Sequence, residues 1–468
     1  MSNESVLLVY PPSQWGYIDR FCQPLGALTL GSILKEAGIK VNVIDLSGEG
    51  WSPQQLFNHM NEENYTHVGA TILTPFRDIG YGILKAAKKI NPNVVTLAGG
   101  PHVSFFKEKV LTEYPELDVA VSGEADLDIV DIIQNPTKKF YDLGCVEDID
   151  SLPIPDRSHV RQIEYNELAG IYMDDSASMK WIRGCPWRKC RFCSRNELTL
   201  KHRRRSPEKI IEEIAIIQHE LKYKNILVVD DSLALNTKFA KTILKLKIKE
   251  GLDIPFWALA RVDQIDEEAF QLMKRANCSG LQVGIESVVP RVIDLYKKAP
   301  GDPKEWLPKV DRALELADKY DIIMIGSFIV GGPTETAKEI QTTIDYLRTS
   351  KVDIVQPFAF QYVIGSEFWH EAIDSGQLKP DDIYAYNDKK YGTSPYTAKE
   401  IFDKVLEAED LVNSPVLNPG RYVRLVKKFI KQKKWRVIWK NILQLPKIIQ
   451  GLLLEHPYDI VIEDELND

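Results

Sequence analysis

The sequence predicts an α/β protein made of two consecutive parallel units, a doubly wound sheet and then a partial six-stranded barrel, followed by a mostly helical C-terminal region. Two observations predict this order. Short apolar runs alternate with helical segments from residue 5 to about residue 122, and the same alternation repeats about six times from Lys180 onward. A third is the length of 468 residues, which exceeds that of one ordinary domain.

The first unit, residues 1–130, contains five short apolar runs that we expect to be buried strands. The helical segment after the first run ends at Gly38, where a left-handed residue is favoured, and Ser52-Pro53 has the residue types of an N-cap and a first helical position. This alternation is typical of a flavodoxin-type parallel sheet. The expected strands are Val6–Tyr10, Val41–Asp45, Val68–Leu73, Val94–Ala98 and Val119–Ser122.

Glycine and polar residues lie at the carboxyl ends of these strands, where doubly wound sheets bind ligands. Thr71 to Thr74 end the third strand, Gly99-Gly100-Pro101-His102 follow the fourth and Gly123-Glu124 follow the fifth. Glycine at such positions lets the backbone approach a large ligand closely. A nucleotide or flavin is the generic expectation, but no G-x-G-x-x-G follows the first strand, so a dinucleotide is weakly supported.

Residues 131–178 lack a clear period and are expected to link the two units. Pro153 and Pro155 disfavour a helix in this stretch. Few contacts are expected to cross such a segment, which is typical of a domain boundary.

The second unit, residues 179–370, has the pattern of a TIM-like barrel that is open on one side. Helix start signals occur at Ser206-Pro207, Asp266 and Pro290, between the expected strands. The chemistry of such barrels lies at the carboxyl ends of the strands. The expected strands are Trp181–Arg183, Ile226–Val229, Phe256–Ala260, Leu281–Ile285, Ile322–Val330 and Ile354–Tyr362.

Three cysteines, Cys185, Cys190 and Cys193, follow the first expected barrel strand on one short loop. Three thiolates hold three irons of a four-iron cluster and leave the fourth iron with an open position. A structural zinc ion is the alternative, and it needs a fourth ligand. The candidates for that ligand are His202, Cys145 and Cys278, none of which falls at a paired zinc-ribbon spacing.

The cysteine loop resembles that of the radical S-adenosylmethionine (SAM) enzymes, in which an aromatic residue commonly precedes the last cysteine, as Phe192 does here. The usual spacing in that superfamily is C-x3-C-x2-C, whereas four residues separate Cys185 from Cys190. One extra residue should be tolerable, because the loop only has to wrap one face of the cluster.

The first unit resembles the cobalamin-binding domain of the B12-dependent radical SAM enzymes. The residues that carry this resemblance are Pro24-Leu25-Gly26, Val43-Ile44-Asp45 and the glycine-containing strand ends. No D-x-H-x-x-G occurs, so the histidine that ligates cobalt in many other cobalamin proteins is missing. We interpret His102 as a residue that contacts the corrin edge or caps a helix rather than as a cobalt ligand.

The resemblance implies a [4Fe-4S] cluster, SAM and cobalamin as cofactors, with the three cysteines as the metal ligands. It implies cofactor contacts at residues of both units, and it assigns no catalytic side chain. The implied contacts are Leu25, Gly26, Asp45, Thr71, Thr74, Gly99, Gly100, Pro101, His102, Gly123 and Glu124 in the first unit, and Phe192, Asp231, Arg261, Gly284, Glu286 and Gly331 in the second.

The activity implied by the resemblance is methylation of an unactivated carbon of a small-molecule or lipid-like substrate through a 5′-deoxyadenosyl radical. An electron donor of flavodoxin or ferredoxin type is the implied partner. A non-methylating cyclase or rearrangement enzyme stays open, as does a zinc-stabilised, non-catalytic scaffold at a membrane surface. A methylthiotransferase would need a second cysteine triad, which Cys22 and Cys145 cannot furnish.

Composition and charge bound the location and the partners. Six cysteines without a pairing pattern, and no signal peptide at Met1–Tyr10, predict a cytoplasmic protein. The net charge of −8 argues against a protein that coats nucleic acid.

The C-terminal region, residues 371–468, contains a basic segment, Arg421–Lys440, with nine Lys/Arg and no acidic residue. Its apolar positions predict an amphipathic helix pair. Packing on the barrel is the favoured interpretation, ahead of peripheral contact with the inner membrane surface and, last, nucleic acid. The apolar run Ile442–Leu454 is broken by Pro446 and is too short to span a bilayer.

Overall fold

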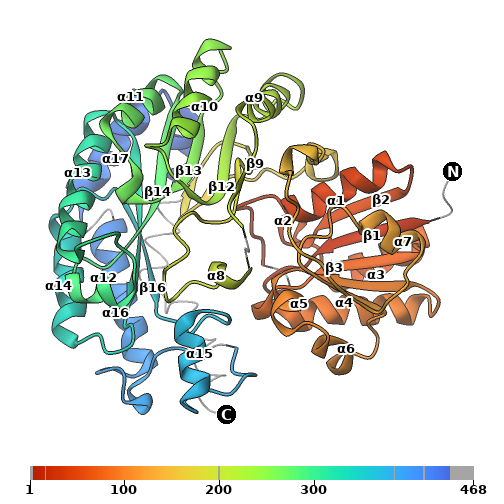
Figure 1. Cartoon of the computed structure of the whole chain (residues 1–468). Helices are drawn as coiled ribbons and strands as arrows, with labels where there is room; N and C mark the ends of the chain where they lie inside the picture. The colour runs from red at the N-terminus through yellow and green to blue at the C-terminus, as the bar shows by residue number, and fades with distance from the viewer. Residues whose placement is uncertain (1–3, 16, 199–200, 384, 415–416, 443–468) are drawn as a thin grey trace.

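The computed structural model describes residues 4–15, 17–198, 201–383, 385–414 and 417–442. Two sheets with their helices lie side by side, the N-terminal one and the barrel, and the cysteine loop lies between them (Figure 1).

The N-terminal sheet is parallel and has the order β2-β1-β3-β4-β5-β6. The first five strands follow the flavodoxin order, which confirms the predicted topology. The sixth strand is a correction, because it lies in the segment that was expected to be a linker. It pairs with β5 and so covers what would otherwise be an unpaired sheet edge. The strands are β1 Ser5–Tyr10, β2 Lys40–Asp45, β3 His67–Thr71, β4 Val95–Gly99, β5 Val119–Ser122 and β6 Phe140–Asp142.

Helices cover both faces of this sheet. On one face lie α1 (Leu25–Glu36) and α7 (Ile129–Gln134), which pack in one apolar cluster with the chain around Tyr165. The other face is covered by α3 Pro53–Glu63, α4 Arg77–Ile90, α5 Pro101–Phe106 and α6 Lys109–Glu113. The carboxyl ends of the strands stay uncovered by helices and face the barrel.

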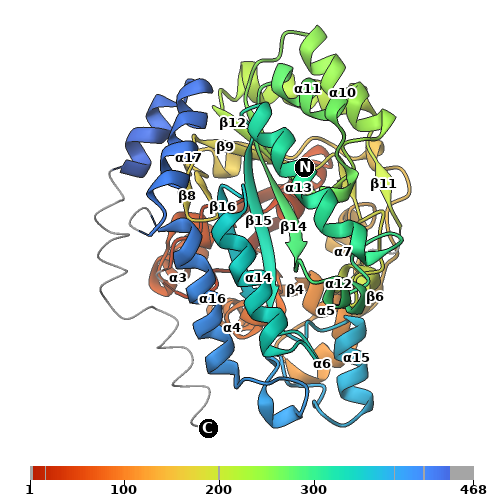
Figure 2. The same ribbon diagram turned by 90° about the vertical axis from the view of Figure 1, so that its left-hand side faces the viewer.

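The barrel sheet is also parallel and has the order β16-β15-β14-β13-β12-β9. Its two edge strands do not pair with each other, so the barrel is open on one side, as predicted. Figure 2 looks onto the helices outside this sheet. The strands are β9 Ser176–Met179, β12 Asn225–Leu233, β13 Phe256–Ala260, β14 Cys278–Glu286, β15 Ile323–Val330 and β16 Ile354–Ala359.

The position of the first barrel strand was predicted wrongly. Trp181–Arg183 is not part of the barrel sheet: β10 (Ile182–Arg183) pairs antiparallel with β11 (Arg203–Arg204). The Asp230 carboxylate accepts hydrogen bonds from the backbone N–H groups of Trp181 and Ile182, at 2.9 and 3.1 Å, and this holds the chain away from the barrel ladder. The β10–β11 pair instead forms the stem of the cysteine loop.

The outer helices begin at side chains that cap their first turns. Ser206 caps α9 (Pro207–Ala215), and Asp266 caps α11 (Glu267–Arg275). The remaining outer helices are α10 Lys238–Lys249, α12 Pro290–Leu295, α13 Trp306–Lys319, α14 Ala337–Thr349 and α16 Ala398–Asn413.

The C-terminal helices fill the amino end of the barrel. Side chains of α17 (Pro419–Lys431) and of the helical residues 435–442 pack on side chains inside the barrel, such as Trp257 and Ile325. Gln432 donates to the carbonyls of Ser279 and Asp321, at the amino ends of β14 and β15.

The basic side chains of this region serve mainly to hold it on the barrel. Lys428 Nζ lies 2.7 Å from Asp353 Oδ2, and both side chains are buried. Lys434 pairs with Asp174, and Arg421 donates to the carbonyls of Leu347 and Ser350. Packing on the barrel, the favoured interpretation of this segment, is therefore confirmed. The apolar run predicted from Ile442 to Leu454 lies outside the described residues after its first position.

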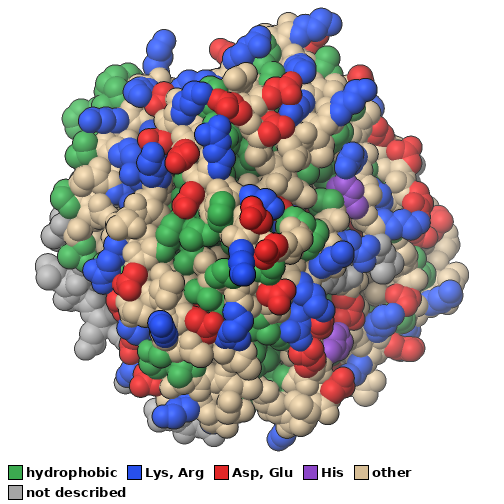
Figure 3. All heavy atoms as spheres, turned by 60° about the vertical axis from the view of Figure 1, so that its left-hand side comes forward, with side chains coloured by type: hydrophobic (Ala, Val, Ile, Leu, Met, Phe, Trp, Pro, Cys, Tyr) green, Lys and Arg blue, Asp and Glu red, His purple; other side chains and the backbone are tan. Residues whose placement is uncertain are grey.

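Exposed apolar side chains remain on the outer side of this C-terminal region. Trp435 is 55% exposed and Trp439 64%, and Val423, Ile430 and Ile442 are also exposed. On the molecular edge formed by the C-terminal helices, hydrophobic side chains reach the surface beside Lys and Arg (Figure 3). Among the described residues, no helix combines the length and the apolarity that a membrane crossing needs.

Candidate cofactor-binding site

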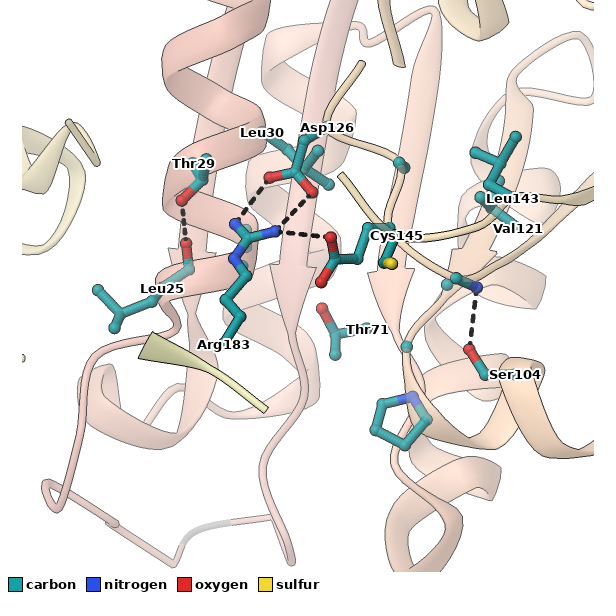
Figure 4. Close-up of a pocket in the computed structure, with 18 of the residues that line it drawn as sticks. Leu25, Thr29, Leu30, Thr71, Ser104, Val121, Asp126, Leu143, Cys145 and Arg183 are labelled. Carbon is teal, nitrogen blue, oxygen red and sulfur yellow. Dashed lines mark hydrogen bonds and ion pairs between the residues drawn. The ribbon is translucent and has the colours of Figure 1, made fainter. Parts of the chain in front are cut away.

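A cavity of about 620 Å³ lies between the carboxyl ends of the N-terminal strands and the stem of the cysteine loop (Figure 4). Its walls are largely apolar and carry a few polar side chains, as is usual for sites that bind large organic ligands. Nine of the predicted contact residues line it: Leu25, Gly26, Thr71, Gly99, Gly100, Pro101, Gly123, Glu124 and Asp231.

Glycines form the part of the wall contributed by the strand ends. Gly123 has a φ of +86°, and a Cβ on it would lie 1.9 Å from the carbonyl oxygen of Leu143. Gly100 has a φ of +98°, and its Cβ would lie 3.1 Å from the carbonyl oxygen of Ile72. Around Gly26 and Gly99, by contrast, a Cβ would meet nothing closer than 3.7 Å. Gly26 and Gly99 thus present bare backbone to an open space, which fits a large, flat ligand such as a corrin.

Asp45 was predicted to contact a cofactor, but it does not line this cavity. It caps the short helix α2 (Leu46–Glu49), accepting from the backbone N–H of Gly48 at 3.1 Å, and it also accepts from the Tyr165 hydroxyl at 2.6 Å. Burial raises the pKa of Asp45 to about 6, despite these donors. Its contacts are those of a residue that organises the end of β2.

His102 and Thr74 also lie outside the cavity lining. The His102 ring is buried in the first turn of α5, 4.5 Å from the Phe106 ring, with Nδ1 3.4 Å from Thr74 Oγ1. Burial, helped by Arg77, lowers the pKa of His102 to about 4, so the imidazole is neutral at physiological pH.

The cysteine loop closes on itself at Gly184, whose φ is +91° and whose Cβ would lie 2.6 Å from the carbonyl oxygen of Lys201. A backbone hydrogen bond of 3.1 Å from Cys193 to Cys190 forms the turn that carries two of the thiols. Burial raises the pKa of the Cys190 thiol and raises that of Cys193 to about 11. Iron must therefore displace protons when it binds here.

The donor set is three thiols on one short loop, each of which can take a separate corner of a four-iron cluster. In the part of the chain that the structure describes, no three His, Cys, Asp or Glu side chains are grouped closely enough to hold a single metal ion. A closed zinc site needs four ligands around one ion, whereas a four-iron cluster takes each thiolate at a separate corner.

Two buried cations stand beside Cys190. Arg261 Nη1 lies 4.0 Å from Cys190 Sγ, and its guanidinium is held by Asp263 at 3.0 and 3.1 Å. Lys298 pairs with Glu286 at 2.7 Å, and Cys190 contributes to the raised pKa of this lysine. A group of three predicted residues is thus brought together here: Arg261, Gly284 and Glu286.

Gly284 is needed for this arrangement, because a Cβ on it would lie 2.3 Å from Glu286 Oε1 and 2.7 Å from Lys298 Nζ. Lys298 was missed by sequence reasoning. It lies in the loop after α12, and no motif distinguishes it from the other lysines of the chain.

Phe192 and Gly331 lie in different surroundings. Phe192 belongs to the cysteine loop itself. Its ring is 5.4 Å from the Tyr296 ring and 6.0 Å from Lys298 Nζ, so it lies beside the group around Cys190. Gly331 N donates to Glu335 at 2.9 Å, and a Cβ on Gly331 would lie 2.7 Å from Ile401 in α16. Gly331 therefore does not join the group around Cys190.

An ion-pair network joins the stem of the cysteine loop to the cavity wall. Arg203 makes two hydrogen bonds to Glu124, at 2.6 and 2.9 Å, and Arg183 pairs with both Glu124 and Asp126. Arg183 and Arg203 face each other in the β10–β11 register. Of these four residues only Glu124 was predicted. The sequence signal that could have identified Arg183 is its position directly before Gly184-Cys185.

A polar group lies inside the barrel between β14, β15 and β16. Gln282 Nε2 donates to Gln356 Oε1 at 2.5 Å and to Ser327 Oγ at 3.3 Å, while Gln282 Oε1 is buried without a partner. Ser327 and Gln356 lie two residues after Ile325 and Ile354 in their strands, and Gln282 is paired with Ile325, so all three side chains share the side that faces the barrel interior. Polar substrate groups could be bound by these amides.

Comparisons with known proteins agree with this geometry. The radical SAM superfamily matches residues 179–347, and the B12 binding domain matches residues 17–133. An uncharacterized methyltransferase of Pyrococcus horikoshii, PH0819, is 30% identical over 400 residues, which cover 80% of this chain and 84% of the relative.

Two further proteins extend the comparison. The anaerobic magnesium-protoporphyrin IX monomethyl ester cyclase of Rubrivivax gelatinosus is 25% identical over 356 residues, covering 71% of this chain and 63% of the cyclase. The solved structure of the cobalamin-dependent SAM radical enzyme OxsB, with aqua-cobalamin and SAM bound, superposes with a TM-score of 0.65 at 14% identity. That match covers 99% of this chain and 83% of OxsB, and it shows a shared fold.

Proposed function

The chain belongs to the cobalamin-dependent radical SAM enzymes, and from this premise we propose that it methylates an unactivated carbon of a small-molecule or lipid-like substrate. The cofactors of this enzyme are a [4Fe-4S] cluster, SAM and cobalamin. Membership of an enzyme family argues against the alternative of a non-catalytic, zinc-stabilised scaffold.

One observation carries the proposal: residues from both units line a single cavity. Gly99, Gly100 and Gly123 come from the N-terminal sheet, whereas Gly184 and Asp231 come from the cysteine loop and from β12. A methyl carrier and a radical source must act on the same carbon atom, so their sites have to open toward each other.

The proposal assigns each cofactor to residues described above. The cavity-lining residues from Leu25 to Glu124 would hold cobalamin, and the three cysteines would hold the cluster. Asp231, together with Arg261, Gly284 and Glu286, would bind SAM, because a carboxylate, a guanidinium and a glycine opening are the groups that its ammonium, carboxylate and ribose require. When bound, the cluster and SAM supply the organic radical and cobalamin supplies the methyl group.

The protein itself positions the substrate and excludes water. The C-terminal helices fill the amino end of the barrel, so solvent does not reach the site from that side. The amides of Gln282 and Gln356 would provide polar contacts beside the apolar side chains that fill the barrel interior. A dry site protects a reactive radical from side reactions.

The alternative of a non-methylating radical enzyme is favoured by the similarity to the cyclase. The products separate the two. After anaerobic incubation with SAM and reductant, a methyltransferase forms S-adenosylhomocysteine together with 5′-deoxyadenosine, whereas a cyclase forms 5′-deoxyadenosine alone. Detection of deoxyadenosine alone with every accepted substrate would exclude methylation.

The cofactor assignment is tested by anaerobic reconstitution. We expect about four irons and four sulfides per chain, with loss of the cluster in Cys185→Ala. Stoichiometric uptake of cobalamin is expected in both proteins, because the cysteines lie outside the cobalamin-binding part of the cavity wall. One zinc and no sulfide would contradict the assignment.

We also propose contact of the C-terminal helices with a membrane surface, which would suit a lipid-like substrate. Exposed Trp435 and Trp439 support this, since indole side chains favour the lipid–water interface. The variant Trp435→Ser/Trp439→Ser should lose co-sedimentation with anionic lipid vesicles, while Phe57→Ser, at another exposed aromatic residue, should not. Equal sedimentation of all three proteins would exclude this contact.

A further inference from the structure

We infer that the outer side of the cysteine loop, formed by Trp187, Arg188, Lys189 and the neighbouring Lys297, is the docking face for an acidic one-electron carrier protein. The inference rests on the proposed function, because it requires a redox cluster at the three cysteines. It adds the face of this chain at which the electron enters and the acidic character of the surface that the carrier would present to it.

The cysteine loop has two different sides. Gly184, Glu197 and Leu198 line the cavity on the side that faces the N-terminal sheet. Helix α8 (Arg195–Leu198), which ends the loop, lies between the two sheets (Figure 1). On the outer side, Pro186, Arg188 and Lys189 are exposed to solvent. A partner protein therefore reaches the loop from the outer side.

Trp187 connects this outer side to a cluster ligand. Its ring lies between two cations, with Lys189 Nζ 5.1 Å and the Arg261 guanidinium carbon 5.0 Å from the ring centroid. Arg261 Nη1 is 4.0 Å from Cys190 Sγ, and its side chain is only 5% exposed. The ammonium of Lys189, the indole of Trp187, the guanidinium of Arg261 and the thiol of Cys190 thus follow one another from the surface inward.

The ring is held in place from its edge. Trp187 Nε1 donates to the carbonyl oxygen of Lys297 at 2.8 Å, so the loop is fixed to the residues that follow α12. Lys297 directs its ammonium to Glu367 at 2.9 Å while its side chain stays half exposed. The indole is therefore oriented before any partner binds, which lowers the entropic cost of docking.

The charge of this face indicates the partner. Arg188, Lys189 and Lys297 are exposed cations around the outer edge of the loop, where Glu367 pairs with Lys297, although the chain as a whole carries a net charge of −8. Local positive charge steers an acidic protein to the face and orients it there. One electron leaves the reduced carrier and one is gained by the oxidised cluster, and no atom is exchanged between the two proteins.

The test uses the cluster-loaded full chain and an acidic flavodoxin as the probe. Lys189→Glu reverses one charge on the docking face, and Lys297→Gln removes another outside the loop. The matched control is Lys249→Glu, an exposed lysine at the end of α10 near the amino ends of the barrel strands. Two readouts besides activity are measured: the dissociation constant of flavodoxin by calorimetry, and the rate at which reduced flavodoxin bleaches the visible absorbance of the cluster.

We expect Lys189→Glu to weaken binding and to slow cluster reduction about tenfold at low ionic strength. Lys297→Gln should have a smaller effect in the same direction, and Lys249→Glu none. The difference from wild type should shrink at high salt, where the charges are screened. Dithionite, which needs no docking face, should reduce all four proteins at equal rates, and equal iron and sulfide content should confirm that the clusters are intact.

Equal flavodoxin binding and reduction in wild type and Lys189→Glu would overturn the docking face. So would the absence of salt-dependent flavodoxin binding to the wild type. In both cases, SAM cleavage driven by dithionite would leave the proposed function standing. Failure of dithionite to reduce the wild type would instead contradict the proposed function.

Discussion

Arg183 and Asp126 form a two-point ion pair that joins the two halves of the molecule. Arg183 Nη1 and Nη2 lie 3.1 and 3.0 Å from the two carboxylate oxygens of Asp126. Arg183 directly precedes the cysteine loop, and Asp126 follows β5 at the wall of the cavity (Figure 4). This pair, together with the contacts of Glu124 with Arg183 and Arg203, links the position of the cysteine loop to that of the cavity wall.

Asp126→Ala should destabilise the protein and weaken cobalamin binding. Both side chains are largely buried, and removal of Asp126 takes away both of its hydrogen bonds and leaves Glu124, at 3.2 Å, as the remaining carboxylate partner of Arg183. We expect a loss of about 3 kcal/mol in the free energy of unfolding, measured by urea denaturation of the cofactor-free chain. Glu63→Gln, which breaks an exposed pair with Lys40, should change the free energy of unfolding much less, because water screens that pair. Equal losses in the two variants would contradict a special role for the pair.

Gly26→Ala should separate cobalamin binding from stability. Gly26 lies in α1 and lines the cavity, and a Cβ there would meet no protein atom within 4 Å. Alanine should preserve the fold, or stabilise the helix by up to about 1 kcal/mol, while its methyl group occupies space assigned to the corrin. A titration with cobalamin should show weaker binding. Gly82→Ala, in α4 and equally free of contacts, is the control that should bind normally.

Gly123→Ala should behave in the opposite way and damage the fold itself. Its left-handed φ and the close carbonyl of Leu143 leave no room for a side chain. We expect a loss of at least about 2 kcal/mol in the free energy of unfolding. A variant as stable as the wild type by thermal denaturation would show that the strand end can rearrange.

Lys298→Met should lower the reduction potential of the cluster. Reduction adds a negative charge, and the buried ammonium beside Cys190 stabilises it. Its removal also leaves Glu286 without its partner. A shift of some tens of millivolts is expected, since about 59 mV corresponds to a tenfold change in a one-electron equilibrium. A redox titration followed by electron paramagnetic resonance measures it, with Lys297→Gln as the exposed control. An unchanged or higher potential in Lys298→Met would contradict this role.

Asp45 should make stability fall as the pH rises from about 4 to about 6. The pKa of this carboxyl is raised in the folded state, so the folded chain binds more protons than the unfolded chain in that window. The contribution is on the order of 3 kcal/mol, fully present below the ordinary pKa and lost above pH 6. Asp45→Asn should cancel this slope in denaturation curves recorded at several pH values, because asparagine still accepts from Gly48. A parallel slope in the variant would show that other groups titrate there.

Sequence periodicity predicted most of the fold because most strands are buried on both faces and therefore appear as continuous apolar runs. It failed where a single side chain redirects the chain. Asp230 binds the backbone at Trp181 and Ile182, and no local pattern distinguishes this carboxylate from one at the surface. Strand β6 was missed for a similar reason: its pairing with β5 is a contact between segments, not a property of Phe140–Asp142.

The candidate site was predictable where backbone geometry requires a residue type. Gly100, Gly123 and Gly184 have left-handed conformations, and Cys185, Cys190 and Cys193 have the spacing of one loop. Contacts over long sequence separations were not predictable. Lys298 meets Cys190, and Lys428 meets Asp353, only after the barrel has formed. Asp45 stands at a strand end as expected, but its oxygens are used by Gly48 and Tyr165.

The packing of the C-terminal helices on Trp257 and Ile325 limits the routes by which substrate can enter and product can leave the barrel. Because the barrel is closed at its amino end by its own chain, substrate and product find no passage on that side. Under the proposed cofactor assignment, both would pass on the side of the barrel where the residues assigned to cobalamin lie.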